Sequence, residues 1–144
     1  MAKSLLRNRG LIFLSRLILG GLFIYASIDK ALNPLEFAQI IHNYRITPPS
    51  LINFAAIILP WIELLTGALL ILGVKVRGAN IVIGGLLVFY IALLATTAAR
   101  GINVACGCFS TSTAAKSNLT IRIIEDIAML LPSMHVFFFH KAKN

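Results

Sequence analysis

Four long runs of apolar residues constrain the fold of this chain more than any other feature of its sequence. They cover residues 11–28, 51–72, 79–98 and 119–139 of the 144-residue chain. A helix of roughly 20 apolar residues crosses the hydrocarbon core of a bilayer, where each backbone amide must be satisfied within its own segment. The sequence therefore predicts an all-α, polytopic membrane protein in which residues 1–144 form a single domain, a bundle of four transmembrane helices.

Composition and charge placement support a lipid partner. Hydrophobic residues make up 58% of the chain, more than a soluble core needs, and the net charge of +8 comes from residues that lie mostly between the apolar runs. This placement fixes orientation in a bilayer and argues against nucleic-acid binding. The basic residues before the first run resemble the start of a secretory signal. No small-x-small cleavage site follows, so we expect the run to remain as an anchor.

The fourth run is the weakest, because Arg122, Glu125 and Asp126 occupy its first two turns. We keep it as a span because residues 127–139 are apolar apart from Ser133 and His135. Four spans leave seven Lys and Arg residues on one side and four on the other. The seven are Lys3, Arg7, Arg9, Lys75, Arg77, Lys141 and Lys143, and the four are Lys30, Arg45, Arg100 and Lys116.

The positive-inside rule then predicts that both termini lie in the cytoplasm. We expect a multi-pass protein of the bacterial cytoplasmic membrane. Residues 29–50 and 100–118 would face the periplasm or the exterior. Within the first of these loops, residues 37–44 have helical spacing before Pro48 and Pro49, which predicts a short amphipathic helix on the outer surface.

Small residues and one proline mark expected features of the bundle. Close helix contacts are expected at the pairs Gly20–Gly21, Gly67–Ala68 and Gly84–Gly85. Pro60 should free the carbonyl of Ala56, giving either a kink or a spare acceptor. The aromatic side chains Tyr25, Tyr44, Trp61 and Tyr90 fit either interfacial belts or a cavity lining, and the sequence does not decide between these roles.

The two thiols of the chain, Cys106 and Cys108, are separated only by Gly107. Glycine leaves room for a very tight disulfide ring, and a strained ring is easily reduced. The pair therefore suits thiol–disulfide exchange in an oxidising compartment, and both cysteines are the candidate catalytic residues. A purely structural disulfide, a zinc site that would need two further ligands, and idle thiols are the alternatives. We expect no metal.

A single thiol pair also limits the electron path. Two electrons taken from a client would leave directly to a small membrane acceptor such as a quinone, or through a periplasmic thioredoxin-like protein.

Ionisable residues within or next to the spans are candidate supporting residues. From their depths in antiparallel neighbours, we predict an ion pair between Arg16 and Glu63, with a structural role in helix register as the favoured explanation. Lys30, Arg122 and Asp126 lie near the depth of the cysteine loop. Arg122 and Asp126 are four residues apart and can pair, and a nearby cation would lower a thiol pKa. Ordinary interface charges are the competing explanation.

Two segments give the chain a family resemblance. The Pro-x-x-Glu-Leu-x-x-Gly segment at residues 60–67 and the Cys-Gly-Cys-Phe segment at 106–109 resemble the MauE family of methylamine-utilisation membrane proteins, within the DoxX-like set. The similarity spans about residues 16–109. It implies a four-helix membrane bundle that assists maturation of a periplasmic methylamine dehydrogenase, with Cys106 and Cys108 as the redox pair and Glu63 as a buried acid.

Three function classes follow. The first is a membrane thiol–disulfide oxidoreductase that acts on a disulfide-containing periplasmic client. The second is a non-enzymatic accessory subunit or chaperone of a respiratory or transport complex, in which the thiols are dispensable. A small-molecule transporter is the third and weakest, because Arg16 and Glu63 are the only clear charges deep in the spans.

Overall fold

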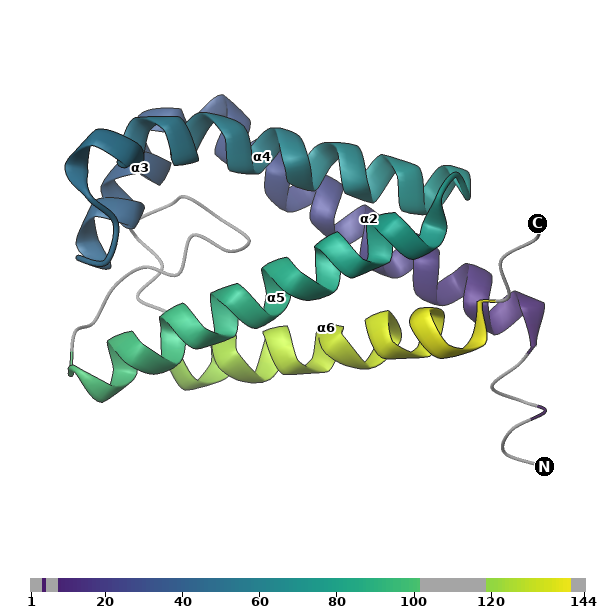
Figure 1. Ribbon diagram of the computed structural model, residues 1–144. Coiled ribbons are helices and arrows are strands. Elements are labelled where there is room, and N and C mark those ends of the chain that lie inside the picture. The colour runs from purple at the N-terminus through teal and green to yellow at the C-terminus, as the bar shows by residue number, and fades with distance from the viewer. Residues whose placement is uncertain (1–3, 5–7, 102–118, 141–144) are drawn as a thin grey trace.

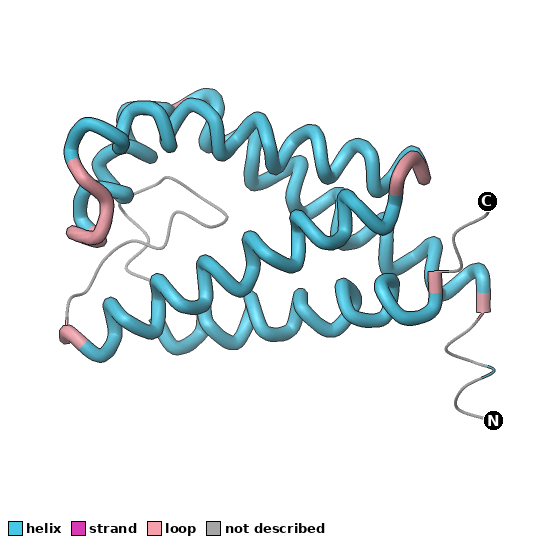
Figure 2. The backbone as a smooth tube through the Cα atoms, viewed as in Figure 1, coloured by secondary structure: helices cyan, strands magenta, loops and turns pink. Residues whose placement is uncertain are grey.

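A computed structural model describes residue 4, residues 8–101 and residues 119–140, and every long element among them is a helix. No strand occurs in these ranges (Figure 2). The helices are α2 (Arg9–Leu32), α3 (Pro34–Asn43), α4 (Pro49–Leu72), α5 (Val76–Ala99) and α6 (Leu119–Phe139). The predicted all-α class is confirmed for this part of the chain.

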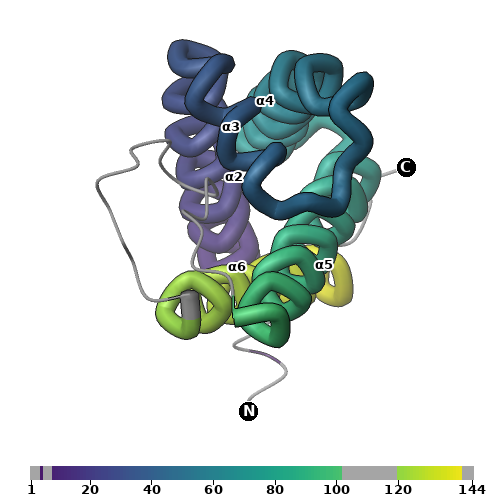
Figure 3. Tube along the Cα trace, turned by 90° about the vertical axis from the view of Figure 1, so that its left-hand side faces the viewer, coloured from purple at the N-terminus to yellow at the C-terminus, as the bar shows by residue number. Residues whose placement is uncertain are grey.

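The four long helices alternate in direction (Figure 1). Helix α2 packs on α4 and α5 packs on α6, while contacts of α2 with α6 and of α4 with α5 join the two pairs (Figure 3). Helix α3 covers the start of α4. We call this the α3 end of the bundle, where α2 and α5 finish and α4 and α6 begin. The opposite end is the turn end, named for the tight α4–α5 turn.

Of the helices that the structure describes, three, α2, α4 and α5, are long and apolar enough to cross a membrane. Helix α6 has the predicted bounds, 119–139, but the charges near its start keep it outside that set. Large apolar side chains point away from the bundle, among them Trp61, Leu65 and Phe138. Such an outward-facing apolar surface is expected of helices in lipid.

The bundle interior contains one main apolar cluster. Its buried members come from α2, α4, α5 and α6. They are Leu19, Phe23, Leu70, Val76, Ile83, Leu87, Met129 and Val136. We call this set the apolar layer.

Glycines set the register of α2 against α4, as the sequence predicts. A Cβ on Gly20 would lie 2.8 Å from the carbonyl oxygen of Gly67, and a Cβ on Gly67 would lie 2.9 Å from that of Gly20. The two backbones therefore touch, which only glycine permits. Gly84 also faces a neighbour, Ser133 of α6, whereas Gly21 and Gly85 face open space.

The short helix α3 confirms the predicted amphipathic helix. Pro34 occupies its first turn, and its buried residues Phe37 and Ile41 pack on Ile52 and Ala56 of α4. Helix α4 runs without interruption through Pro60, which is buried. It ends at Gly73, whose φ of 79° is the left-handed conformation that favours glycine.

Candidate functional site

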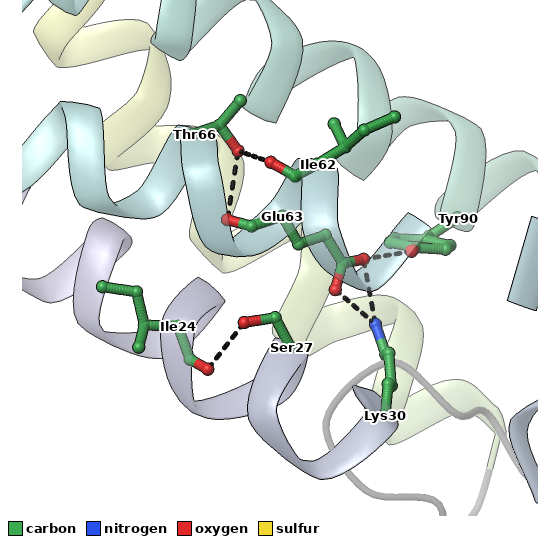
Figure 4. Close-up of polar contacts among 7 residues, drawn as sticks. All are labelled: Ile24, Ser27, Lys30, Ile62, Glu63, Thr66 and Tyr90. Carbon is green, nitrogen blue, oxygen red and sulfur yellow. Dashed lines mark hydrogen bonds and ion pairs between the residues drawn. The ribbon is translucent and has the colours of Figure 1, made fainter. Parts of the chain in front are cut away.

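Two of the most deeply buried charges of the described residues, one on α2 and one on α4, meet a tyrosine of α5. Lys30 of α2 donates to both carboxylate oxygens of Glu63 of α4, at 2.9 Å each. The hydroxyl of Tyr90, on α5, donates to Oε1 of the same carboxylate (Figure 4). Lys30 is 0% and Glu63 1% exposed. Each of the three side chains is thus held by a partner on a different helix.

The direction of side chains along a helix explains why Lys30 and Glu63 meet. A Cα–Cβ bond leans toward the N-terminus of its own helix. Counted from the Gly20–Gly67 contact at about 1.5 Å per residue, Lys30 lies about 15 Å and Glu63 about 6 Å toward the α3 end. Because α2 and α4 are antiparallel, the Lys30 side chain leans toward the turn end and the Glu63 side chain leans toward the α3 end. The two side chains therefore meet at a height between their Cα atoms.

The predicted ion pair between Arg16 and Glu63 is wrong. Arg16 lies on the turn-end side of the glycine contact and donates to the carbonyl oxygens of Leu70 at 2.9 Å and Ile71 at 3.3 Å. Its side chain leans toward the start of α2, away from Glu63. The prediction rests on the depth of each residue below the end of its span. That depth contains neither the register of α2 against α4 nor the direction in which a side chain leans. Arg16 instead satisfies the last carbonyls of α4, beside Gly73.

Aromatic rings complete the surroundings of Lys30. Its Nζ lies 5.3 Å from the ring centroid of Phe37, on α3, and 5.0 Å from that of Tyr90. A cation over a ring face gains electrostatic attraction, and the gain is larger where water is excluded. The Phe37 ring also shields the ion pair from water, because α3 covers the pair at the α3 end of the bundle. Hydroxyls nearby are used locally, since Thr66 and Ser27 donate to carbonyls of their own helices (Figure 4).

A second buried carboxyl group lies within electrostatic range. Asp126 of α6 is 1% exposed and attracts the charge of Lys30. It also acts on Tyr44, a buried residue that caps α3. Burial, assisted by the negative charge of Asp126, raises the pKa of the Tyr44 hydroxyl above its ordinary value. We call Lys30, Glu63, Tyr90 and Asp126 the charged cluster. Each long helix contributes one member.

Arg122 occupies the rim of this cluster. Its guanidinium is half-buried and binds the exposed carboxylate of Glu125 at 2.9 Å. It also interacts electrostatically with Asp126, the partner that the four-residue spacing suggests. Of the supporting residues predicted from sequence, Lys30, Glu63, Arg122 and Asp126 therefore lie near one another, and Arg16 lies elsewhere.

The structure describes neither Cys106 nor Cys108, which lie in the undescribed segment 102–118. The helix ends that this segment joins are both at the α3 end of the bundle. Among the described residues, no group of three or more His, Cys, Asp or Glu side chains could hold a metal ion.

Sequence reasoning missed Tyr90 and Tyr44 as parts of the site. Both are buried, whereas Tyr25 and Trp61 are exposed, so only the latter two fit a lipid-facing belt. A count of residues from Glu63 could not identify Tyr90 as its partner, because the position of α5 against α4 depends on how the two helices pack. A signal was present nonetheless: Tyr90 follows Ile83 and Leu87 at helical spacing, on the buried stripe of α5.

A second polar layer lies toward the turn end. Asn80 of α5 donates to the carbonyl oxygen of Ser133 on α6 at 2.8 Å, and the Ser133 hydroxyl lies 3.2 Å from Oδ1 of Asn80. Nearby, the Ser15 hydroxyl of α2 lies 3.2 Å from Nδ1 of His135, on α6. These contacts join helices through neutral or half-buried groups. They differ in kind from the wholly buried ion pair.

Fold and site together define a class: a helical protein with spans suited to a membrane, built around a buried lysine, glutamate and tyrosine. The chain belongs to the MauE family, since the model described as methylamine utilisation protein MauE matches residues 8–139.

Two curated relatives, both named methylamine utilization protein MauE, agree with this assignment. The protein of Paracoccus denitrificans is 30% identical over 95 residues, which are 65% of this chain and 51% of the relative. That of Methylorubrum extorquens is 33% identical over 85 residues, 58% of this chain and 46% of the relative. The matches thus span about half the length of each relative. No solved structure matches the chain.

Proposed function

We propose that this chain is a membrane thiol–disulfide redox protein that acts through Cys106 and Cys108 on an extracytoplasmic client. The observation that carries the proposal is the sequence itself: both thiols of the chain fall within three residues, in the connection between α5 and α6. The family model describes a role in methylamine utilisation, and the sequence resemblance implies that this role is the maturation of another protein. The buried ion pair at the same end of the bundle adds support, because ionisable residues within spans mark functional sites.

The proposed topology has α6 as a fourth span and both termini in the cytoplasm. Basic residues support it. Arg9, Lys75 and Arg77 lie at the turn end, whereas the α3 end mixes basic residues with Asp29 and Glu36. The positive-inside rule then assigns the turn end to the cytoplasm and the α3 end to the periplasm or exterior.

In the proposed exchange, a client thiolate attacks one sulfur of a Cys106–Cys108 disulfide and forms a mixed disulfide. The second client thiol displaces it and closes the client disulfide. The client loses two electrons and two protons, and Cys106 and Cys108 gain them as thiols. A quinone, which becomes a quinol, or the disulfide of a thioredoxin-like protein then takes up the two electrons and two protons. The same exchange run in reverse would reduce a client disulfide.

The names of the relatives suggest the client. Both are methylamine utilization proteins, and the sequence resemblance points to a methylamine-dehydrogenase-type enzyme of the periplasm as the protein that receives disulfides. For this chain, that client is part of the proposal.

Trapping tests the redox role directly. In a Cys106→Ser or Cys108→Ser variant the remaining thiol can still attack a client disulfide, which is the proposed exchange run in reverse, but the chain has no second thiol to release the client from the mixed disulfide. We therefore expect one of the two variants to accumulate a disulfide-linked client that reductant releases. Ser110→Ala, in the same connection, is the matched control and should trap nothing. Complementation of a deletion strain should fail with the double Cys→Ser variant. Full complementation by the double variant, together with no trapped adduct in either single variant, would favour the non-enzymatic accessory subunit instead.

An impermeant maleimide tests the orientation. In intact cells treated with mild reductant, both cysteines should be labelled. Labelling only after the cells are opened would place the thiols in the cytoplasm and remove the proposed exchange.

A further inference from the structure

Basic side chains from three helices gather at the turn end of the bundle, away from the charged cluster. They are Arg16 of α2, Arg77 of α5 and His140, which directly follows α6. The start of α2, the α4–α5 turn and the end of α6 all lie at this end (Figure 1). Burial, assisted by the positive charges of Arg16 and Arg77, lowers the pKa of the His140 ring. We call these three residues the basic site.

The register of α5 against α6 places Arg77 and His140 at the same height. Gly84 of α5 faces Ser133 of α6, where a Cβ on the glycine would lie 3.4 Å from the serine hydroxyl. Arg77 precedes Gly84 and His140 follows Ser133 by about two helical turns each, which is about 10 Å. Because α5 and α6 are antiparallel, both residues lie this far from the contact toward the turn end.

The end of α4 holds the third cation in place. Nε of Arg16 donates to the carbonyl oxygen of Leu70, and Nη2 donates to that of Ile71. A Cβ on Gly73 would lie 2.6 Å from Nη2, so the guanidinium rests against the turn that leads to Arg77. These two hydrogen bonds use two of the five N–H groups of a guanidinium. The half-buried Arg16 side chain thus retains donors for a ligand beyond α4.

No carboxylate side chain of the sequence lies where it could neutralise these cations. Residues 1–28, 64–124 and 127–144 contain neither Asp nor Glu, and these ranges include the segments that the structure does not describe. The acidic residues of the described helices lie away from the turn end, and Lys30 binds the nearest of them along α4, Glu63. Arg9 and Lys75 add further positive charge at the turn end. An anion that is not an acidic side chain of this sequence has to balance the basic site.

Exposed apolar side chains border the basic site, which favours an amphipathic anion over a soluble one. Leu72 and Val74 lie on either side of Gly73, and Leu17 adjoins Arg16; all three are exposed. A phospholipid can place its phosphate among the cations and its acyl chains along these side chains. Basic pockets between membrane helices are known binding sites for anionic headgroups.

We propose that Arg16, Arg77 and His140 bind the phosphate of an anionic phospholipid in the leaflet at the turn end, and that this lipid joins α2, α5 and α6 there. The two guanidinium groups donate to phosphate oxygens, and the negative charge favours the protonated His140 ring. The inference goes beyond the redox proposal and needs neither cysteine. It also holds whichever side of the membrane the turn end faces.

Nuclear magnetic resonance of the histidine rings tests the site in the wild-type protein. The full chain, labelled with nitrogen-15 in histidine, is placed in phosphatidylcholine nanodiscs with or without phosphatidylglycerol. Bound phosphatidylglycerol should raise the pKa of His140, and loss of its signal in His140→Gln assigns the ring. The exposed His42, on α3, is the internal control because it responds only to the general surface charge of the bilayer. A His140 ring that responds no more than His42 would overturn the proposal.

Native mass spectrometry of the full chain measures the affinity for phosphatidylglycerol. Arg77→Gln should weaken binding about fivefold, the usual contribution of one basic side chain near an anionic surface. Adding His140→Gln should weaken it further. Arg16 is left unchanged in these variants because it also caps α4. Arg100→Gln removes an exposed cation at the α3 end and is the matched control. An equal loss in the control would show that only net charge matters and would overturn the site.

Competition identifies the source of the phosphate. Glycerol 3-phosphate has the phosphate and glycerol of the lipid without its acyl chains, and inorganic phosphate has neither. Neither compound should displace phosphatidylglycerol at equal concentration. Displacement by either one would indicate a site for a soluble phosphate and would overturn the lipid assignment. The double Cys→Ser variant should bind phosphatidylglycerol as the wild type does, so the redox role and the lipid site are tested separately.

Discussion

The two polar layers of the bundle both satisfy buried polar side chains, but with different interactions. Toward the α3 end, Lys30, Glu63 and Tyr90, which we call the charged layer, are joined by an ion pair and hydrogen bonds. Toward the turn end, Asn80 and Ser133, which we call the neutral layer, are joined by neutral hydrogen bonds. A neutral pair fixes helix register at little desolvation cost, whereas a buried ion pair is rarely worth its cost in stability alone. The contrast indicates that the charged layer serves function and the neutral layer serves assembly.

The largest expected effect comes from breaking the charged layer on one side. Lys30→Met removes the cation and leaves Glu63 as an uncompensated buried charge, which should cost about 3–5 kcal/mol of unfolding free energy. Titration with a denaturing detergent in mixed micelles measures it. Replacing the whole group, with Lys30→Met, Glu63→Leu and Tyr90→Phe, should restore most of the loss. A triple variant as unstable as Lys30→Met would show that the charged layer is needed for the fold itself.

Packing below the cluster should come next in size. Gly20→Ala places a methyl group against the Gly67 carbonyl and forces α2 and α4 apart, at a cost of about 1–3 kcal/mol. The same detergent titration applies. Gly21→Ala is the matched control, since nothing lies within 4 Å of its Cβ position, and it should change stability little. Equal effects of the two substitutions would mean that the glycine contact does not set the register.

The neutral layer should respond more weakly. A double-mutant cycle with Asn80→Ala and Ser133→Ala should give a coupling of about 0.6 kcal/mol, the average for hydrogen bonds between membrane helices. Detergent titration measures the free energy of unfolding of the wild type, the two single variants and the double variant, from which the coupling is calculated. A coupling as large as that between Lys30 and Glu63 would erase the distinction between the layers.

The rim pair should have the smallest effect. Arg122 and Glu125 are three residues apart on α6 and partly exposed. Glu125→Gln should therefore cost about 0.3–0.5 kcal/mol, and less at high salt. Unfolding measurements at two salt concentrations check both statements. A loss of several kcal/mol would show that Arg122 must be neutralised to keep the charged cluster intact.

The sequence predicted helices well and their ends less well. Hydropathy located all four long helices, and α6 has the bounds expected. Helix α2 was expected to stop at residue 28, because Asp29 and Lys30 look like the start of a polar loop, yet it continues to Leu32. Lys30 can remain in the helix because Glu63 neutralises it. Similarly, α5 begins at Val76 rather than 79, since a charge at Arg77 is tolerated near a bundle end.

The residue types of the site were predictable, but their pairing was not. Ionisable residues in or beside spans pointed to Lys30, Glu63 and Asp126. The partner of Glu63 depended on which backbone atoms touch at Gly20 and on the direction in which each side chain leans. Neither quantity is visible in a count of residues from the ends of the spans. The choice of Arg16 failed for this reason.

The distance along the chain between Lys30 and Glu63 has a consequence for biogenesis. During synthesis, α2 is made before α4, so the lysine enters the membrane without its carboxylate. Its position near the end of α2 lets the ammonium group remain among the lipid headgroups until α4 is made. Only when the next long helix arrives can both charges leave water together. Closure of this first helical hairpin should therefore be the committed step of membrane insertion.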